Sequence, residues 1–282
     1  MRLLSILIYH RVLRQLDPLL PGVPDQRQFA RQMSMLKRCF QVLPLSQAID
    51  LLKNDALPRR AACITFDDGY ADNFEIALPV LQSLGLNACF FIASGYLDGG
   101  RMWNDDVIAG VRSSAGTAAE RVAAIETKLG QIKYLPARQR SAIAQQLAPD
   151  PSEDLMMTSA QLRILHRSGM EIGAHTVSHP ILRIQPDHLA LQDIAQSKLA
   201  LEAIVDAPVT LFAYPNGKPG IDYDLRHVEM ARRCGFSGAV TTVAAAASAA
   251  SDCFQLPRFT PWEPDRSRFI LRLLQNRYHS RA

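Results

Sequence analysis

Ile64-Thr65-Phe66-Asp67-Asp68-Gly69-Tyr70 is the stretch on which the expected fold and chemistry depend. Residues 61–66 are mostly apolar and predict a short buried strand. Asp67 and Asp68 then lie at the carboxyl end of that strand, where open and barrel α/β folds place their sites. Two adjacent carboxylates repel each other as water is excluded, so the pair needs a cation, a shared proton or solvent. The stretch therefore points to metal ligands elsewhere in the chain.

A second motif, residues 173–180, carries two histidines four positions apart, His175 and His179, directly after another short strand-like segment. Two imidazoles and one carboxylate form a three-ligand set with an open position, which suits zinc or a similar divalent ion. We assign Asp68 as the carboxylate ligand and Asp67 as the base that accepts a proton from the attacking water. Alone, the aspartate pair is most often a helix cap or a solvated turn, and the histidine spacing is a weak signal. Their joint occurrence behind two predicted strands favours a catalytic site.

The motifs Thr-Phe-Asp-Asp-Gly and His-Thr-x-x-His-Pro resemble those of the metal-dependent polysaccharide deacetylases, the NodB-like carbohydrate esterases. The resemblance extends from residues 9–12 to residues 256–259. It implies an α/β fold, a distorted (β/α) barrel, and the length fits a single domain over residues 1–282. It also implies the same roles for the four motif residues, with Zn²⁺ as the expected ion and Co²⁺ or Ni²⁺ as alternatives.

One departure from the family pattern concerns the arginine that contacts the catalytic base. The family commonly carries Arg-Pro-Pro-Tyr after a strand, whereas residues 213–216 here are Ala-Tyr-Pro-Asn. The backbone N–H of Asn216 still suits the family's role in oxyanion binding. Arg258, after another strand-like segment, is our candidate for the missing arginine, and a solvent-exposed arginine is the alternative. The residues that we expect to contact the substrate are Tyr70, Trp103, Tyr214 and Asn216.

A second departure concerns the general acid. The family usually ends in a Leu-x-His segment whose histidine protonates the leaving amine, and the sequence has no such segment near residue 282. Tyr9-His10-Arg11-Val12 follows the first predicted strand and resembles a branch of biofilm and exopolysaccharide deacetylases with a circularly permuted motif order. This resemblance implies His10 as the general acid. The alternative is a structural histidine that hydrogen-bonds the barrel mouth.

Strand and helix patterns alternate along most of the chain, which is typical of a parallel sheet or barrel. Residues 98–157 break the alternation and predict a helical insertion over the barrel mouth, with Trp103 as a sugar-stacking platform. The alternative is a pair of solvated helices without substrate contact. In the alanine-rich run 239–250, Val240-Thr241-Thr242-Val243 favours a strand that leads into a loop, although alanine propensity alone predicts a helix.

Charge and cysteine content limit the partners and the compartment. The net charge is +4, and residues 265–282 hold five arginines against one aspartate, so the rest is neutral and argues against nucleic-acid binding. A terminal helix near 266–278 is expected to dock on the barrel, with contact to an anionic membrane as the alternative. Five widely spaced cysteines, a short apolar start without a cleavage site and no stretch of about 18 apolar residues favour a cytoplasmic protein.

Together these features predict a metal-dependent hydrolase that removes N-acetyl groups from N-acetylhexosamine units of a polysaccharide or lipid-linked glycan. A cytoplasmic location favours a lipid-linked intermediate or a small N-acyl sugar over a cell-wall polymer. Two alternatives remain, namely hydrolysis of a small N-acyl or cyclic amide, and a catalytically inactive glycan-binding domain. The complete aspartate and histidine set disfavours an inactive domain, while the departures from the family pattern keep it open.

Overall fold

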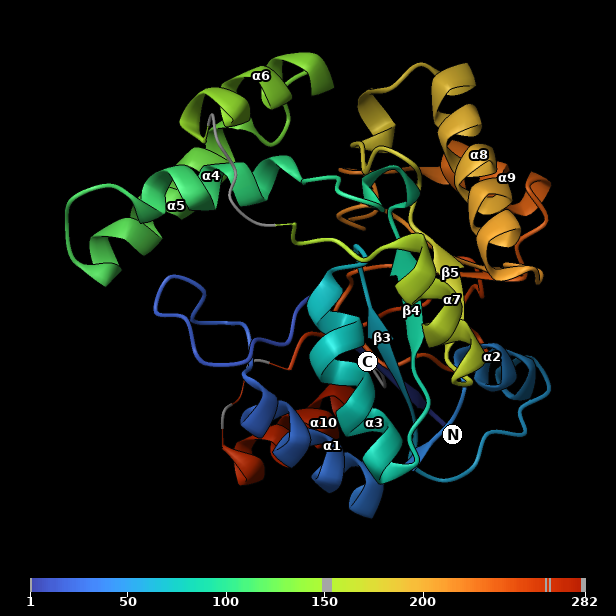
Figure 1. The fold of residues 1–282 in the computed structure, drawn as a ribbon. Coiled ribbons are helices and arrows are strands. Elements are labelled where there is room, and N and C mark those ends of the chain that lie inside the picture. Colours follow the sequence, from blue (N-terminus) through green and yellow to red (C-terminus); the bar gives the residue numbers. More distant parts are fainter. Residues whose placement is uncertain (1, 149–153, 262, 264, 280–282) are drawn as a thin grey trace.

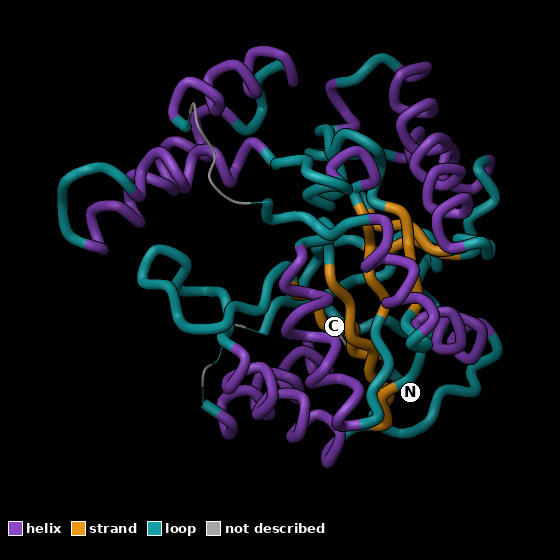
Figure 2. Tube along the Cα trace, in the orientation of Figure 1, coloured by secondary structure: helices purple, strands orange, loops and turns teal. Residues whose placement is uncertain are grey.

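The computed structural model describes residues 2–148, 154–261, 263 and 265–279. Within these residues the strands form one parallel sheet in the order β1-β3-β4-β5-β6-β7, with the short β2 paired to β3. Figure 2 shows the strands in the middle of the main body, with helices around them. The strands are β1 Leu4–Tyr9, β2 Gln41–Val42, β3 Ala61–Phe66, β4 Cys89–Ile92, β5 Glu171–Ala174, β6 Leu211–Ala213 and β7 Gly238–Val240.

The sheet curls into a barrel that residues 256–259 complete. Leu256 pairs with Val240 of β7, and Phe259 pairs with Leu7 of β1. The backbone hydrogen bonds on both sides of this segment measure between 2.8 and 3.0 Å. The predicted distorted (β/α) barrel is therefore confirmed, as a half-barrel sheet of parallel strands that an irregular segment joins to its first strand.

The strand side chains divide into two apolar layers because successive residues of a strand point to opposite faces. In β1, Leu7 and Tyr9 belong to the layer that packs against the surrounding helices, and Leu4 and Ile6 belong to the layer inside the barrel. Helix α2 (Leu45–Lys53) contributes to the inner layer. Its first backbone N–H groups donate to Glu171, the first residue of β5. α2 therefore closes the barrel at the amino ends of the strands and leaves the carboxyl ends open.

Three of the helices that cover the barrel, α1, α7 and α9, begin at a polar side chain that caps their first turn. Asp25 caps α1 by accepting from the Gln28 N–H, and Thr158 caps α7 by accepting from the Gln161 N–H. A π-helical turn, Asn73–Ala77, precedes α3, which ends at Gly85 in the left-handed region (φ +61°). These helices are α1 Gln26–Cys39, α3 Leu78–Leu84, α7 Ser159–Arg167, α8 Asp187–Val205 and α9 Leu225–Arg233, with 3₁₀ turns at Ser94–Tyr96 and Leu182–Ile184.

Two of the expectations for this half of the chain have different outcomes. The run begins in β7 and continues as a loop in which Ala247 bridges to Leu4, so the predicted strand followed by a loop is present. The strand ends earlier than predicted, because of the predicted residues 240–243 only Val240 belongs to β7. Helix α9 has no counterpart among the predicted helices. Four of its nine residues are charged, and among its apolar residues Val228, Met230 and Ala231 are buried while Leu225 is exposed. A short apolar face of this kind gives a weak periodic signal.

Three helices project from one side of the barrel (Figure 1), and in the sequence they lie between β4 and α7. They are α4 Trp103–Arg112, α5 Ala118–Ile132 and α6 Ala137–Leu147. They form their own small apolar clusters, such as the one of Val107, Ile132 and Ala144. The predicted helical insertion is therefore present, although its residues 149–153 lie outside the described residues.

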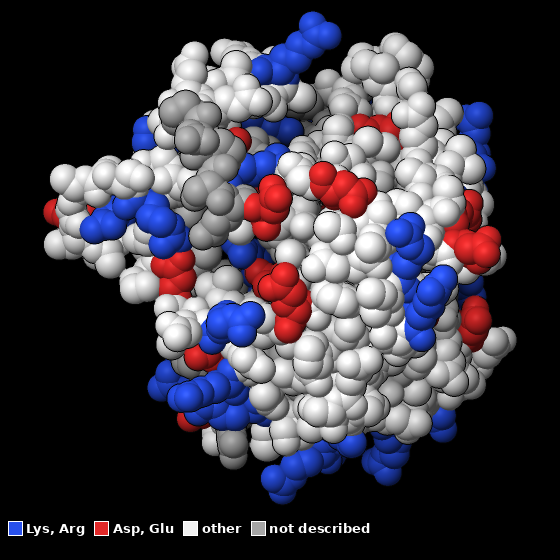
Figure 3. All heavy atoms as spheres, viewed as in Figure 1, with Lys and Arg blue, Asp and Glu red and all other residues white. Residues whose placement is uncertain are grey.

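The terminal helix α10 (Arg266–His279) packs against α1 and β1. Its Phe269 and Leu273 are fully buried in the outer apolar layer, which confirms the predicted docking. Contact of this helix with a membrane stays a prediction. No described helix is both long enough and apolar enough to cross a membrane. Figure 3 shows basic and acidic side chains scattered over a mostly uncharged face, with lysine and arginine side chains along its lower edge.

Candidate active site

The two adjacent aspartates lie at the carboxyl end of β3, as predicted. Asp68 (φ +78°) and Gly69 (φ +93°) both have left-handed backbone conformations, so the chain turns sharply directly after the strand. A Cβ atom at Gly69 would lie 3.2 Å from Cγ2 of Ile92, so the turn also packs tightly against β4. Non-glycine residues with positive φ are uncommon and cluster at functional sites. This turn aims Asp67 and Asp68 at the same end of the barrel.

The two histidines follow β5 in a loop that neighbouring residues hold tightly. Thr176 (φ +66°) and His179 (φ +47°) are again left-handed, and the Thr176 hydroxyl accepts from the His179 N–H at 3.1 Å. On α8, one carboxylate oxygen of Asp193 accepts from the Val177 and Ser178 N–H groups, at 2.6 and 3.1 Å. The loop conformation is therefore fixed before any ligand binds.

Asp68, His175 and His179 bring one ligand atom each into a group that spans less than 4.8 Å. Oδ1 of Asp68 lies 3.4 Å from Nε2 of His179 and 3.6 Å from Nε2 of His175. Two ligand atoms on one tetrahedral ion, each at a bond length of about 2.1 Å, would be about 3.4 Å apart. The spacing of the three side chains thus fits a single zinc-sized ion.

Hydrogen bonding supports the same assignment. Within the described part of the chain, Asp68 Oδ1 is buried and has no hydrogen-bond partner. His175 Nδ1 lies 2.8 Å from the Ala213 carbonyl oxygen, to which it donates as the protonated ring nitrogen. This bond leaves Nε2 of His175 with a lone pair directed at Asp68, the arrangement that orients metal-binding histidines. The residues present therefore fit a divalent metal.

The electrostatics of the three residues also favour a cation. Burial lowers the pKa of His175 to about 4, and burial lowers the pKa of His179 well below its usual value. Both imidazoles are then neutral at physiological pH, the form that binds metal. Burial, and then the negative charge of Asp67, raise the pKa of Asp68 well above its usual value. The site therefore disfavours the Asp68 carboxylate until a positive charge compensates it.

Arg258 lies in the segment that completes the barrel, and its fully buried side chain points at Asp67. Nη1 and Nη2 of Arg258 each donate to one oxygen of Asp67, both at 2.7 Å. Nη1 also donates to the Thr65 hydroxyl and Nε donates to the Thr241 carbonyl. The predicted contact between Arg258 and the candidate base is present, and the alternative of an exposed arginine is wrong.

This arginine determines the charge of Asp67. Burial by itself would raise the pKa of Asp67, but the charges of Arg258 and His175 outweigh burial and bring the pKa down to about 2. Bidentate pairs between an arginine and a carboxylate are among the strong hydrogen-bonded contacts in proteins. Asp67 is therefore ionised and fixed in orientation throughout the physiological pH range.

His10 follows β1 at the same end of the barrel. Its side chain is exposed, and the Asn73 side chain donates to its backbone carbonyl at 2.8 Å. Although the residue is exposed, partial desolvation by the groups around its imidazole is the largest influence and lowers the pKa of His10, while the negative charge of Asp67 raises it and the charge of Arg258 lowers it. The influence of Asp67 and Arg258 places the imidazole within electrostatic range of the candidate base. Its role as the general acid stays a prediction.

Comparison with known proteins agrees with this geometry. Residues 54–239, more than half of the chain, match the family model described as polysaccharide deacetylase. The chain belongs to the polysaccharide deacetylase family. It is 24% identical over 257 residues to the polysaccharide deacetylase homologue YxkH of Bacillus subtilis (strain 168), a match that covers 90% of this chain and 70% of that protein.

Two solved structures show the same fold over nearly the whole chain. The Streptococcus pyogenes deacetylase PplD, in complex with acetate, has a TM-score of 0.68 and 20% identity, and the match covers 97% of each chain. IcaB from Ammonifex degensii has a TM-score of 0.66 and 21% identity, with 95% of this chain and 97% of that chain covered. At these identities the likeness concerns the fold.

The predicted substrate-binding residues differ in where the structure places them. Tyr214 is wrong as a substrate contact, because its fully buried ring stacks on Tyr223 at 3.9 Å between centroids and its hydroxyl donates to the Phe254 carbonyl. Asn216 lies in the turn after β6 with φ +61°, and its role in oxyanion binding stays a prediction. The residue pattern misplaced Tyr214 because β6 is too short to reveal which face its next residue takes.

Tyr70 and Trp103 are both held by protein contacts. Tyr70 is only 2% exposed, and its hydroxyl donates to the Asp105 carboxylate at 3.2 Å. Tyr70 therefore joins the barrel to the insertion, and its contact with the substrate stays a prediction. Trp103 is half-buried, and the Arg140 guanidinium lies 5.1 Å from its ring centroid. Sugar stacking on Trp103 stays a prediction.

Residue patterns also missed a polar network beneath the His10 loop. Asp72 accepts from Nε of Arg11 at 2.7 Å and from the Val12 N–H at 3.2 Å, and Asn73 supports the His10 carbonyl. Asp72 and Asn73 follow the aspartate motif within a few residues, and this closeness was the signal by which the sequence could have revealed them. Asp193, which holds the histidine loop, could have been noticed as an acidic residue within an otherwise apolar stretch of α8.

Proposed function

We propose that this chain is a metal-dependent N-deacetylase that hydrolyses the acetamide group of N-acetylhexosamine units in a glycan. The observation that carries the proposal is that a group of three possible metal ligands and an ionised carboxylate lie side by side at one end of the barrel. Asp68 Oδ1 faces two imidazole nitrogens at 3.4 and 3.6 Å, and beside it Arg258 holds Asp67 ionised through two hydrogen bonds of 2.7 Å. Family membership provides the reaction type.

In this proposal Asp68, His175 and His179 hold the divalent metal, and zinc fits their spacing and their donor atoms best. When bound, the metal would act as a Lewis acid that lowers the pKa of water and polarises the acetyl carbonyl. It would also neutralise the Asp68 carboxylate, whose pKa is otherwise raised by burial and by Asp67. Co²⁺ and Ni²⁺ remain alternatives because the same donor atoms bind them.

Asp67 accepts the proton of the attacking water in the proposed reaction. Arg258 keeps this carboxylate ionised and fixes its direction, so Asp67 is always ready as an acceptor. The same arginine makes Asp67 a weak base, with a pKa of about 2. Proton transfer therefore depends on a water molecule that is itself acidified, which is consistent with a metal in the adjacent group of ligands.

His10 completes the reaction by protonating the departing nitrogen. Water oxygen bonds to the carbonyl carbon, the bond between that carbon and nitrogen breaks, and the products are acetate and an amine. The pKa of His10 is lowered by loss of solvent, which makes its protonated form a stronger acid toward nitrogen. The backbone N–H of Asn216 is our candidate for stabilising the oxyanion.

Family membership supports a glycan with N-acetyl groups as the substrate. The particular glycan is our own proposal. We favour an N-acetylhexosamine in a lipid-linked or polymeric glycan, handled by a cytoplasmic protein. Hydrolysis of a small N-acyl or cyclic amide is the alternative activity. An inactive glycan-binding domain is disfavoured, because the arginine that seemed absent from residues 213–216 is supplied by Arg258.

The test is acetate release from N-acetylglucosamine monomers and from oligomers of increasing length by the zinc-loaded protein. We expect release that increases with chain length if neighbouring sugars contribute binding energy. Release from small N-acyl amides but from no glycan would favour the alternative activity. Zinc binding without turnover of any of these compounds would contradict the proposed function.

A further inference from the structure

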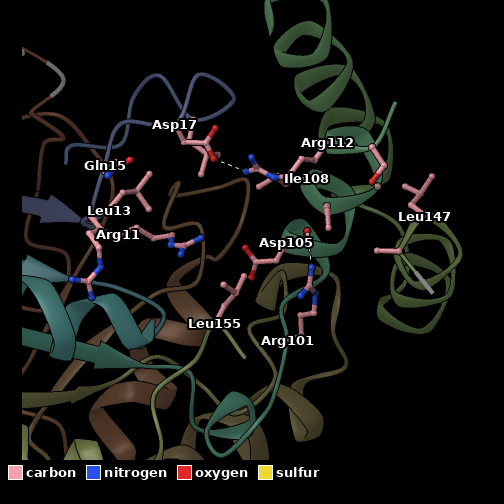
Figure 4. A pocket seen from close by; sticks show the side chains of 16 residues that line it. Arg11, Leu13, Gln15, Asp17, Arg101, Asp105, Ile108, Arg112, Leu147 and Leu155 are labelled. Atoms are coloured by element: carbon pink, nitrogen blue, oxygen red, sulfur yellow. Dashed lines mark hydrogen bonds and ion pairs between the residues drawn. The ribbon is translucent and has the colours of Figure 1, made fainter. Parts of the chain in front are cut away.

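A cavity of about 710 Å³ lies between the loop after β1 and helix α4 of the insertion (Figure 4). Its volume falls within the range of about 300–1,000 Å³ that is usual for small-molecule sites. None of Asp67, Asp68, His175 and His179 is among the residues that line it. The cavity is thus separate from the reacting centre, and its walls are partly charged and partly apolar.

Three residues connect the cavity with the candidate active site. Arg11, in one wall, directly follows His10 in the sequence, and its guanidinium lies 4.7 Å from the ring centroid of Tyr70. Tyr70 follows Asp68 and Gly69, and its hydroxyl donates to Asp105 in the opposite wall. Arg11 and Asp105 of the cavity walls thus both contact Tyr70, which lies two residues after Asp68 in the turn that follows β3.

Four arginines line the cavity, Arg11, Arg14, Arg101 and Arg112, against two aspartates, Asp17 and Asp105. In Figure 4, Arg11 lies on one side and Arg101 and Arg112 lie on the other. Three of these arginines are each paired with a carboxylate, Arg11 with Asp72, Arg101 with Asp106 and Arg112 with Asp17. Arg11 uses its Nε and Arg112 its Nη2 in these pairs, so other N–H groups of these two side chains can still donate to a ligand. Arg14 is exposed and makes no ion pair within the described ranges.

The chemistry of these walls favours an anion. Guanidinium groups match phosphate oxygens in geometry as well as in charge. These arginines lie on two sides of the cavity (Figure 4). A tetrahedral phosphate can accept from both sides, whereas a planar anion is better suited to one wall. Asp105 is turned to the Tyr70 hydroxyl, and Asp17 is paired with Arg112, so both lining carboxylates have partners in the protein.

We propose that this cavity binds a phosphate group carried by the glycan next to the reacting N-acetylhexosamine. The inference rests on the proposed function and narrows its substrate to a phosphorylated glycan. Leu13, Ile108 and Leu155 in the same walls would contact the apolar faces of the sugar or of a group esterified to the phosphate.

The first experiment compares acetate release from an N-acetylglucosamine disaccharide with release from its 1-phosphate. For the wild-type protein we expect kcat/KM to be at least about tenfold higher for the phosphorylated compound, since hydrogen bonds to charged groups are strong. Arg14→Gln should remove most of that preference, and because Arg14 is exposed this change should not affect folding. Ala109→Phe, which fills the cavity from α4, should do the same without changing charge.

Arg27→Gln is the matched control, because Arg27 is exposed on α1 and does not line the cavity. It should keep the wild-type preference. Equal kcat/KM for the two compounds in the wild type, or a preference that Arg14→Gln and Ala109→Phe leave unchanged, would overturn the proposal. A disaccharide with a uronic acid in place of the phosphate tests whether any anion suffices, and equal rates with it would refute specificity for phosphate.

A binding measurement separates this inference from the proposed function. The zinc-loaded Asp67→Asn protein should bind the phosphorylated disaccharide more tightly than the neutral one, and adding Arg14→Gln should reduce the difference about tenfold. If this binding preference appears but no compound releases acetate, the cavity assignment stands and the proposed function fails. If acetate is released without any preference, the proposed function stands and the cavity assignment fails.

Discussion

Asp67 and Arg258 are 191 positions apart in the sequence and form a bidentate pair in the barrel. Arg258 makes the contact with the candidate base that the family resemblance assigns to an Arg-Pro-Pro-Tyr segment, which residues 213–216 lack. In the segment that joins β7 to β1, the side chain of Phe259 packs into the outer apolar layer, whereas that of Arg258 points into the barrel. Arg258 thus places its positive charge beside Asp67. A side chain from a different segment can thus restore the environment of a catalytic base.

Arg258→Gln should change the pH dependence of the reaction. Asp67 must be ionised to accept a proton, and Arg258 now holds its pKa at about 2, so Asp67 imposes no acid limb near neutral pH. Without the arginine, burial raises the pKa of Asp67, so Asp67 becomes protonated at a higher pH. Activity should therefore be lost at a less acidic pH than in the wild-type protein. We expect the acid limb of kcat/KM to move up by at least about one pH unit, measured between pH 4 and 8.

Arg258→Lys is the matched variant, since it retains a positive charge and should shift the limb less. Circular dichroism would check folding, because breaking a buried ion pair typically costs about 3–5 kcal/mol. An acid limb in Arg258→Gln that coincides with the wild-type limb would contradict the assignment of Asp67 as the base that Arg258 controls.

At the scale of elements, the loop after β5 depends on a residue of α8. Asp193 accepts from the N–H groups of Val177 and Ser178 and from the Ser178 hydroxyl, and thereby holds the two residues that precede His179. Asp193→Ala should weaken zinc binding by about 10–100-fold, the usual effect of losing a group that orients a metal ligand. Competition with a chromogenic chelator would measure the affinity.

Gln196→Ala is the control for this measurement, because Gln196 is exposed on the same helix. Its zinc affinity should equal that of the wild-type protein. If Asp193→Ala also kept the wild-type affinity, the loop would hold its conformation without α8, and the account of its preorganisation would be wrong.

Sequence patterns predicted the elements best where several signals coincide. The strand 61–66, for example, combines an apolar run with the Asp-Asp-Gly turn that follows it. They failed where one signal stood alone. Helix α9 has a short apolar face, and β6 has only three residues, which do not reveal that Tyr214 turns into the core. Element ends with positive φ, such as Thr176, were also beyond residue patterns.

At the scale of the whole molecule, the barrel and the insertion meet at Tyr70 and Asp105. Burial raises the pKa of Asp105 to about 6, above the value of about 3.9 expected in the unfolded chain. The folded protein therefore holds this proton more tightly than the unfolded chain. The resulting stability is complete below about pH 4 and is lost as the pH rises through about 6.

Asp105→Asn should remove this pH dependence. Asparagine keeps an oxygen for the Tyr70 hydroxyl but does not ionise, so the variant should gain stability relative to the wild type between pH 4 and pH 7. The gain is at most about 3 kcal/mol, from the size of the pKa shift. Urea unfolding at both pH values measures it, with Asp50→Asn on the exposed side of α2 as control. An unchanged difference between the two pH values would contradict the role of Asp105.

The whole-molecule arrangement was the least predictable from sequence. The alternation of strands and helices and the deacetylase motifs predicted a distorted barrel with an insertion at residues 98–157. They did not predict that residues 256–259 join β7 to β1, or that the insertion encloses a cavity against the loop after β1. Both features depend on contacts between segments that are far apart in the chain, and local residue patterns carry little information about such contacts.

The most direct test of the central claim combines metal content with turnover in three proteins. Zinc content and acetate release from N-acetylglucosamine oligomers would be measured for the wild type, Asp67→Asn and His175→Ala. We predict that chelated wild type regains activity with zinc, that Asp67→Asn binds zinc but loses about 10²–10⁴-fold in kcat, and that His175→Ala loses zinc. Full activity in Asp67→Asn, or unchanged zinc content in His175→Ala, would contradict the account.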